Sequence, residues 1–411
     1  MPRVEPFRAL RPLPEHAARV ASVPYDVVST AEARALASGN DLSFLHVVRS
    51  EIDLPPSVPA DDPRVYGKAF ANLARFEAAG VLVREPEPVM YVYRLETGGH
   101  VQTGVVGAVS VEDRECGAIR EHELTRKDKE DDRLRHIETC RAYAEPVYLM
   151  HRPAPAVSST VAEVTNEAPL FDFGADNGVR HTLWGIAGKE KLDRFVAAFA
   201  ALPALYVADG HHRTAAAVRH AEAGRAGRTG EWRGGREFFP AVIFPENELR
   251  VLGYHRVVMD LNGHTPRALL DEIRGRFDVV TPGVPEQAAR GVIGMFVDGC
   301  WHLLRPAAGT FDAADPLASV DISILQQNLL APLLGIEDLR TDPRIDFVSG
   351  ARGPREIERR CREDAKVGFF VAPVTAAQVM AVSDAGGIMP PKSTWFDPKP
   401  RSGLFVKTLD E

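Results

Sequence analysis

The chain has 411 residues, of which 45% are hydrophobic and 26% are charged, as in an ordinary globular protein. Its net charge of −8 and pI of about 5.9 argue against non-specific DNA binding, so no nucleic-acid partner is expected. There is no run of about twenty apolar residues and no signal-peptide core, so the sequence predicts no membrane span and a cytoplasmic location.

The first hundred residues mix short strands and helices. Residues 22–30 predict an extended segment leading into a helix, with Ser29 and Glu32 as its capping box. Asp26 and Ser29 lie at the N-terminus of that helix, where anions and the oxygen ligands of metal ions are favoured. The alternative is that Ser29 only caps the helix. Residues 41–48 predict a strand, and 90–96 with 101–111 predict a β-hairpin around Gly98–Gly99.

Residues 117–139 are the most densely charged stretch, and a helix is predicted from about Lys129. The part from Lys127 to Arg135 is typical of a solvated helix face. His122 and Glu123 precede it, and a carboxylate beside a histidine suits a general base or a metal ligand. We therefore assign His122 and Glu123 to a candidate site.

The middle of the chain leads to an unusual polar cluster. Residues 153–177 predict a linker or a helical excursion, 192–202 a helix, and 204–207 a strand. Asp209-Gly210-His211-His212-Arg213 follows that strand directly. The alanine-rich residues 214–223 then predict a helix that stops at Gly224.

The position of this cluster predicts a phosphate cradle. The first N–H groups of a helix lack intrahelical partners, and the helix dipole favours an anion there. Gly210 allows close approach of the backbone to a ligand, Arg213 can fork onto phosphate oxygens, and the histidines and Thr214 add further donors. In the alternative interpretation Asp209 only caps the helix and Arg213 pairs with it on the surface.

The C-terminal part predicts two strands within 235–261, mostly helix over 310–335, a strand at 366–374 and a short helix at 375–384. The tail carries Lys392, Ser393 and Thr394. It is not a P-loop, because Pro391 stands where that motif needs glycine. The tail is either a polar loop that holds phosphate or a lid whose Trp395 and Phe396 pack on the core.

Two strand-like segments each offer polar groups to a cleft, namely Arg180 with His181 and His255 with Arg256. Strands and helices that mix without strict alternation indicate an α+β fold. We expect one unit over residues 1–411, with a subdivision into 1–150 and 178–411 as the alternative. The four cysteines form no Cys-x-x-Cys pair, which argues against a zinc ribbon.

Five separate motifs lie along nearly the whole chain, namely "VPYDVVS", "IREHELTRKDKEDDR", "RHTLW", "YVADGHHRTAAA" and "MPPKSTWFDPKPRSGL". In this order they resemble domain-of-unknown-function family 1015. The family name implies no activity. The Asp209–Arg213 box also resembles, over about a dozen positions, the Asp-Gly-His-x-Arg box of free-serine kinases in the ParB/sulfiredoxin superfamily. This second resemblance implies a nucleotide-binding core in which the box opens a phosphate-binding helix.

The leading hypothesis is a nucleotide-dependent phosphotransferase that acts on a small hydroxylated metabolite, with L-serine as the first substrate to try. ATP or another nucleotide and Mg²⁺ are the expected cofactors. Residues 210–213 would hold the polyphosphate, Asp209 would bind Mg²⁺ or orient the acceptor hydroxyl, and Glu123 or Asp26 would be the second carboxylate. Lys392 would neutralise the transferred group.

The alternatives are a metal-dependent hydrolase and a non-catalytic nucleotide sensor. The hydrolase is disfavoured, because adjacent histidines on a strand or helix point apart. The sequence leaves the oligomeric state open, with a homodimer as one arrangement.

Overall fold

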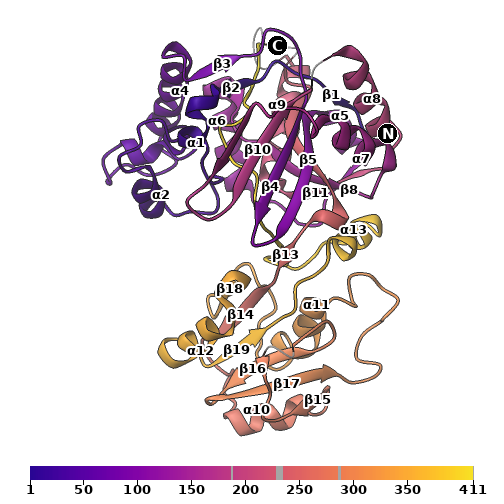
Figure 1. Ribbon diagram of the computed structural model, residues 1–411. Coiled ribbons are helices and arrows are strands. Elements are labelled where there is room, and N and C mark those ends of the chain that lie inside the picture. The colour runs from indigo at the N-terminus through magenta and orange to yellow at the C-terminus, as the bar shows by residue number, and fades with distance from the viewer. Residues whose placement is uncertain (187, 228–234, 286–287, 411) are drawn as a thin grey trace. The chain divides into compact units, whose positions relative to one another are not determined.

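The computed structural model describes residues 1–186, 188–227, 235–285 and 288–410 of a mixed α/β chain (Figure 1). The chain forms two compact units. The first unit comprises Met1–Glu121, Thr125–Leu249 and Pro398–Glu411, and the second comprises His122–Leu124 and Arg250–Asp397. Among the described residues, no helix combines the length and the apolar character that crossing a membrane requires.

A nine-stranded mixed sheet organises the first unit, in the order β6-β11-β8-β12-β5-β4-β10-β9, with β1 also paired to β5. Figure 1 shows β4, β5 and β10 side by side. The strands are β1 Val4–Glu5, β4 Tyr91–Thr97, β5 His100–Ser110, β6 Ile119–Arg120, β8 Val147–His151, β9 Phe171–Gly174, β10 Arg180–Gly185, β11 Leu205–Asp209 and β12 Phe238–Pro245. Two small sheets join β2 Leu10–Pro12 to β3 Leu82–Arg84, and β7 Ala142–Tyr143 to β21 Lys407–Thr408.

The helices of the first unit build two hydrophobic cores. One core joins the large sheet to α5–α9, and it includes Ile137, Phe195 and Ala216. The other lies among α2–α4 and the small sheets, and it includes Phe44 and Phe76. The helices are α1 Pro14–Val20, α2 Thr30–Ala37, α3 Leu45–Val48, α4 Pro63–Ala78, α5 Val111–Glu115, α6 Lys127–Cys140, α7 Pro155–Val164, α8 Lys189–Ala200 and α9 His211–Arg225.

The second unit has a six-stranded antiparallel sheet in the order β15-β17-β16-β19-β14-β18. Its strands are β14 Tyr254–Val258, β15 Phe277–Val280, β16 Ile293–Val297, β17 Cys300–Pro306, β18 Ile345–Ser349 and β19 Val367–Phe370. A separate pair joins β13 Val251–Leu252 to β20 Trp395–Phe396. The helices are α10 Pro266–Ile273, α11 Asp321–Leu325, α12 Gly353–Glu363 and α13 Ala376–Asp384, and a π-helical turn, Gln326–Leu330, continues α11.

Several sequence predictions are confirmed. The hairpin of β4 and β5, the Ser29–Glu32 capping box and the helix after residue 375 all form. Three predictions are wrong. Residues 45–48 form helix α3 rather than a strand, because a short apolar run does not distinguish a buried helix from a strand. Residues 310–320 form turns rather than helix.

The third error concerns Gly224, which does not end α9. The helix continues to Arg225, and Gly227, whose φ is +69°, follows it. A Cβ atom at Gly224 would lie 2.7 Å from Nη1 of Arg236. The glycine therefore serves close packing against an arginine rather than helix termination.

Candidate functional site

The Asp209–Arg213 box lies in the first unit, where β11 passes into α9. The pairing of β11 with β8 shifts register between Val207 and Asp209, and such irregularities re-aim the side chains that follow them. Gly210 is the N-cap of α9, with a φ of +100° that favours glycine. A Cβ atom there would lie 2.9 Å from Nε of Arg213. Gly210 thus lets the Arg213 side chain fold back over the helix start.

Asp209 is the anionic centre of the box. One of its carboxylate oxygens accepts a hydrogen bond from Nζ of Lys399 at 2.5 Å, and the other accepts from Nη2 of Arg213 at 2.8 Å. Burial would raise the pKa of this carboxyl group, but Lys399 and Arg213 outweigh burial and lower the pKa to about 2. Asp209 makes no side-chain cap of α9, because Gly210 holds that position. The pairing of Arg213 with Asp209 does form, with both side chains largely buried rather than exposed.

Arg213 also donates from Nη1 to the backbone oxygen of Pro146. Its guanidinium is therefore engaged by protein acceptors on two sides. Thr214 is buried, and its hydroxyl donates to the backbone oxygen of Gly210 at 3.2 Å. The side chains of Arg213 and Thr214 therefore help to hold the start of α9 in place.

Helix α6 runs beside α9 in the same direction. At the start of the pair, Nε2 of His212 accepts a hydrogen bond from the backbone N–H of Arg126, the N-cap of α6, at 3.1 Å. About two turns further on, Arg219 of α9 pairs with Glu130 and Asp131 of α6. Both contacts follow the same order along the two helices, so α6 and α9 are parallel. Their N-termini, which are the positive ends of the helix dipoles, therefore lie next to each other.

Side chains of both charges surround these converging N-termini. Lys127 and Lys129 are exposed on the first turn of α6 and make no ion pair with any described residue. Burial lowers the pKa of His212, and the carboxylate of Asp26 is the largest of the charges that oppose this shift. Asp26 is exposed and also acts on Arg213. The converging helix ends therefore carry two exposed lysines and the exposed carboxylate of Asp26, none of which forms an ion pair with a described residue, beside the exposed pair of Arg126 and Asp128.

A buried ionic group contacts Tyr25, the residue that precedes Asp26. Glu145 accepts hydrogen bonds from the backbone N–H of Tyr25 at 3.0 Å and from the Ser402 hydroxyl at 2.8 Å, and burial raises its pKa. The guanidinium carbon of Arg133 lies 3.9 Å from the centre of the Tyr25 ring, and Nη1 lies 3.5 Å from Glu145. These contacts fix the backbone that presents Asp26.

A small cavity of about 20 Å³ lies among Arg133, Glu145 and Arg213. That volume is close to the space occupied by one water molecule, and its polar walls would satisfy one. The cavity is too small to hold a substrate.

The other sequence-predicted residues belong to the second unit. His122 and Glu123 form part of it, as do Lys392, Ser393 and Thr394. His122 accepts from the backbone N–H of Met389 at 2.8 Å through its own backbone oxygen, and its Nε2 lies 3.4 Å from the Thr394 hydroxyl. The structure thus brings His122 and the 392–394 loop together within that unit.

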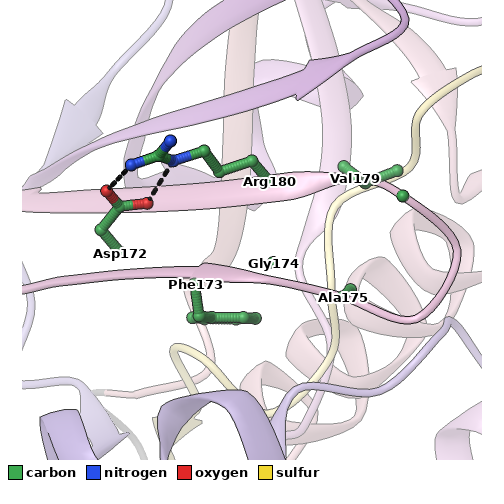
Figure 2. A pocket seen from close by; sticks show the side chains of 7 residues that line it. Asp172, Phe173, Gly174, Ala175, Val179 and Arg180 are labelled. Carbon is green, nitrogen blue, oxygen red and sulfur yellow. Dashed lines mark hydrogen bonds and ion pairs between the residues drawn. The ribbon is translucent and has the colours of Figure 1, made fainter.

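A pocket of about 300 Å³ lies at the turn between β9 and β10 in the first unit (Figure 2). Figure 2 shows Asp172 and Arg180 paired with each other, through hydrogen bonds of 2.8 and 2.5 Å. His181 is buried and bonded to the Tyr93 hydroxyl at 2.7 Å. Because the charged groups satisfy one another, the pocket offers no free charge, and we assign it no function.

Sequence reasoning missed Lys399 and Glu145, and it treated Lys127 and Lys129 as a solvated surface. Glu145 carries a weak signal, since it is a single charged residue in the otherwise uncharged stretch 142–150. Lys399 lies in the quoted C-terminal motif, but nothing in its neighbours indicates a contact with a residue 190 positions earlier.

Comparison with known proteins adds a family match. The sequence model of a family described as "Protein of unknown function (DUF1015)" matches residues 4–323. No curated protein matches the chain in sequence.

Solved structures similar to the chain include a free serine kinase in complex with AMP, at 11% identity and a TM-score of 0.39. That likeness covers 74% of this chain and 91% of the kinase. SbnI from Staphylococcus aureus, with a C-terminal truncation, has 14% identity and a TM-score of 0.40, over 74% of this chain and 87% of SbnI. A conserved hypothetical protein from Pyrococcus furiosus has 13% identity and a TM-score of 0.35, over 74% and 95% of the two chains. At these scores the likenesses carry no argument about function.

Proposed function

The chain belongs to the DUF1015 family, and from that premise we propose that its first unit is a nucleotide-dependent phosphotransferase acting on a small hydroxylated metabolite. The observation that carries the proposal is the convergence of the α6 and α9 N-termini at His212 and Arg126. The first N–H groups of a helix lack intrahelical partners, so two adjacent helix N-termini with aligned dipoles favour a polyphosphate over a neutral ligand.

The cations at this site match the charge of a nucleotide. Lys127 and Lys129 are exposed without ion-pair partners among the described residues, so they are available to phosphate oxygens. His212 uses Nε2 as an acceptor for the Arg126 N–H, which assigns its proton to Nδ1 and makes Nδ1 a donor. We infer that these three side chains and the first turns of α6 and α9 hold the phosphates. A ParB/sulfiredoxin-like core remains part of this proposal.

Asp26 is the carboxylate best placed for the chemistry. Phosphoryl transfer needs a group that orients the attacking hydroxyl. It also needs a divalent ion such as Mg²⁺, which would neutralise the charge that develops on the phosphate. Asp26 is exposed, makes no ion pair with a described residue, and stands close enough to His212 and Arg213 to act on both. We propose that it orients the acceptor hydroxyl or holds Mg²⁺, and L-serine is the first acceptor to test.

For Asp209 we propose a positioning role. Each of its carboxylate oxygens accepts a hydrogen bond from a cationic side chain in this arrangement. We propose that Asp209 positions Arg213 and Lys399 and thereby fixes the start of α9. Glu123 and Lys392, which belong to the second unit, remain candidate site residues. The mechanism proposed for the first unit does not require them.

The test is product formation. The pure protein is incubated with ATP, ADP or CTP, Mg²⁺, L-serine and a pool of small alcohols and amino acids, and phosphorylated products are sought by mass spectrometry. We expect a product with the parent. Asp26→Asn should bind nucleotide within a few-fold of the parent and lose about 100-fold in turnover, because a positioned carboxylate acts mainly in the transition state.

Asp61→Asn is the matched control, since Asp61 is also an exposed carboxylate of the first unit. Normal turnover in Asp26→Asn would remove that residue from the mechanism. Nucleotide binding by the parent without any phosphorylated product would favour the sensor.

A further inference from the structure

The second unit buries an arginine that forms no ion pair with any described residue. Arg256 lies on β14 and is 1% exposed. Its Nη1 donates to the backbone oxygen of Tyr254, and its Nη2 donates to the backbone oxygen of Lys392 at 3.2 Å. These two bonds use two of the five guanidinium donors, and neither acceptor carries a negative charge.

The surroundings of Arg256 show that its charge is uncompensated. Burial lowers the pKa of Arg256 to about 9, and no carboxylate contributes to that shift. The centre of the Phe347 ring lies 5.6 Å from the guanidinium carbon, which gives a weak attraction only. A buried charge without a partner is unfavourable, and an anionic ligand that pairs with Arg256 would remove that cost.

A second cation stands at the same loop. Lys392 has a φ of +56°, a conformation that non-glycine residues adopt rarely and that often marks ligand sites. Its side chain is exposed and makes no ion pair with a described residue, and Nζ lies 5.5 Å from the centre of the Tyr254 ring. Because Tyr254 and Arg256 are two positions apart on β14, they face the same side of the sheet as Lys392.

Neutral donors complete the surroundings. Ser393 is buried and donates to the backbone oxygen of Pro390, which holds the loop in shape. Thr394 follows it, with its hydroxyl 3.4 Å from Nε2 of His122. The loop thus joins two positive charges to hydroxyl and imidazole groups.

We propose that Arg256 and Lys392 form an oxyanion site of the second unit that takes a phosphate group. Two positive charges match a phosphate dianion, whereas a carboxylate would balance only one of them. Arg256 and Lys392 both belong to the second unit, and the site does not depend on the phosphotransferase proposal.

Inorganic phosphate titrated into the full chain at constant ionic strength tests the site, with the backbone amides of Ser393 and Thr394 followed by NMR. We expect saturable shifts of these amides with the parent. Lys392→Gln should raise the midpoint about 10-fold, the scale of one charge-assisted hydrogen bond, and Arg256→Met should abolish the saturation. Lys366→Gln removes an exposed lysine of the same unit and should leave the midpoint unchanged.

Acetate at the same ionic strength serves as the carboxylate probe, and we expect a weaker response to it. Amides that do not shift with phosphate in the parent would overturn the proposal, as would an unchanged midpoint in Lys392→Gln. If Arg256→Met fails to fold, Lys392→Gln alone decides. Equal midpoints for phosphate and acetate would reject phosphate as the ligand class. A Lys127→Gln/Lys129→Gln variant should keep the 393–394 response, which separates this site from that of the first unit.

Discussion

At the scale of residues, the candidate site depends on which charges are satisfied inside the protein and which face solvent. Asp209 and Arg213 look like ligand-binding residues in the sequence, yet each is bonded to protein groups. Lys127 and Lys129 look like ordinary surface residues in the sequence, yet at the helix ends they are exposed and form no ion pair with a described residue, as is also true of Asp26. A residue's type predicts its chemistry, whereas only its partners show whether that chemistry is available.

The pairing of Asp209 with Lys399 makes a prediction for stability. Asp209→Asn and Lys399→Met should each lower the free energy of unfolding, because each leaves a charge without its partner. The double variant should be less destabilised than the sum of the two, with a coupling energy of about 1 kcal/mol or more. Urea unfolding of the parent and the three variants measures this coupling. Strictly additive effects would show that the ion pair contributes nothing to the fold.

At the scale of elements, the junction of β11 and α9 depends on Gly210. Gly210→Ala would place a methyl group against Arg213 and force a left-handed conformation on alanine. Gly39→Ala imposes a similar conformation, at φ +74°, in a place where no atom lies within 4 Å of the added carbon. We expect Gly39→Ala to cost about 1 kcal/mol and Gly210→Ala to cost clearly more and to weaken nucleotide binding.

Thermal unfolding and calorimetric nucleotide titration of the two glycine variants make the comparison. Equal stability and equal nucleotide affinity in both would mean that the packing of Arg213 over Gly210 is unimportant.

The sequence predicted many elements because their signals are local. The Gly98–Gly99 turn between alternating strands and the Ser29–Glu32 capping box each need only a few neighbouring residues. Helix α3 and the turns of 310–320 were mispredicted because tertiary packing decides the conformation of short apolar runs.

The site was predictable only in part for the same reason. The box itself is contiguous, so its place at a strand-to-helix junction could be predicted. The parallel packing of α6 on α9 joins residues 86 positions apart, and the support of Tyr25 by Glu145 joins residues 120 positions apart. No pattern within one sequence contains those pairings.

At the scale of the whole molecule, buried histidines give stability a dependence on pH. Burial lowers the pKa of His136 to about 4, below the ordinary value of about 6.5. Between these two values the unfolded chain binds the extra proton, so stability is present above about pH 6.5 and is lost as the pH falls towards 4.

His136→Gln should therefore flatten the fall in unfolding free energy between pH 6 and 5 by about 1.4 kcal/mol per pH unit, the effect of one proton. Glutamine retains a donor for the backbone oxygen of Val47, which His136 contacts at 3.0 Å. Urea unfolding at several pH values gives the two slopes. Identical slopes in parent and variant would show that His136 does not stay neutral in the folded chain.

The central claim is that the converging N-termini of α6 and α9 bind nucleotide phosphates, and calorimetric titration with ATP, ADP and CTP in the presence of Mg²⁺ tests it most directly. We predict that the parent binds at least one of them and that Lys127→Gln/Lys129→Gln weakens binding about 10-fold or more, the scale of one or two charge-assisted contacts. Lys366→Gln, an exposed lysine of the second unit, should bind like the parent. No binding of any nucleotide by the folded parent, or equal affinity in the double variant, would contradict the account.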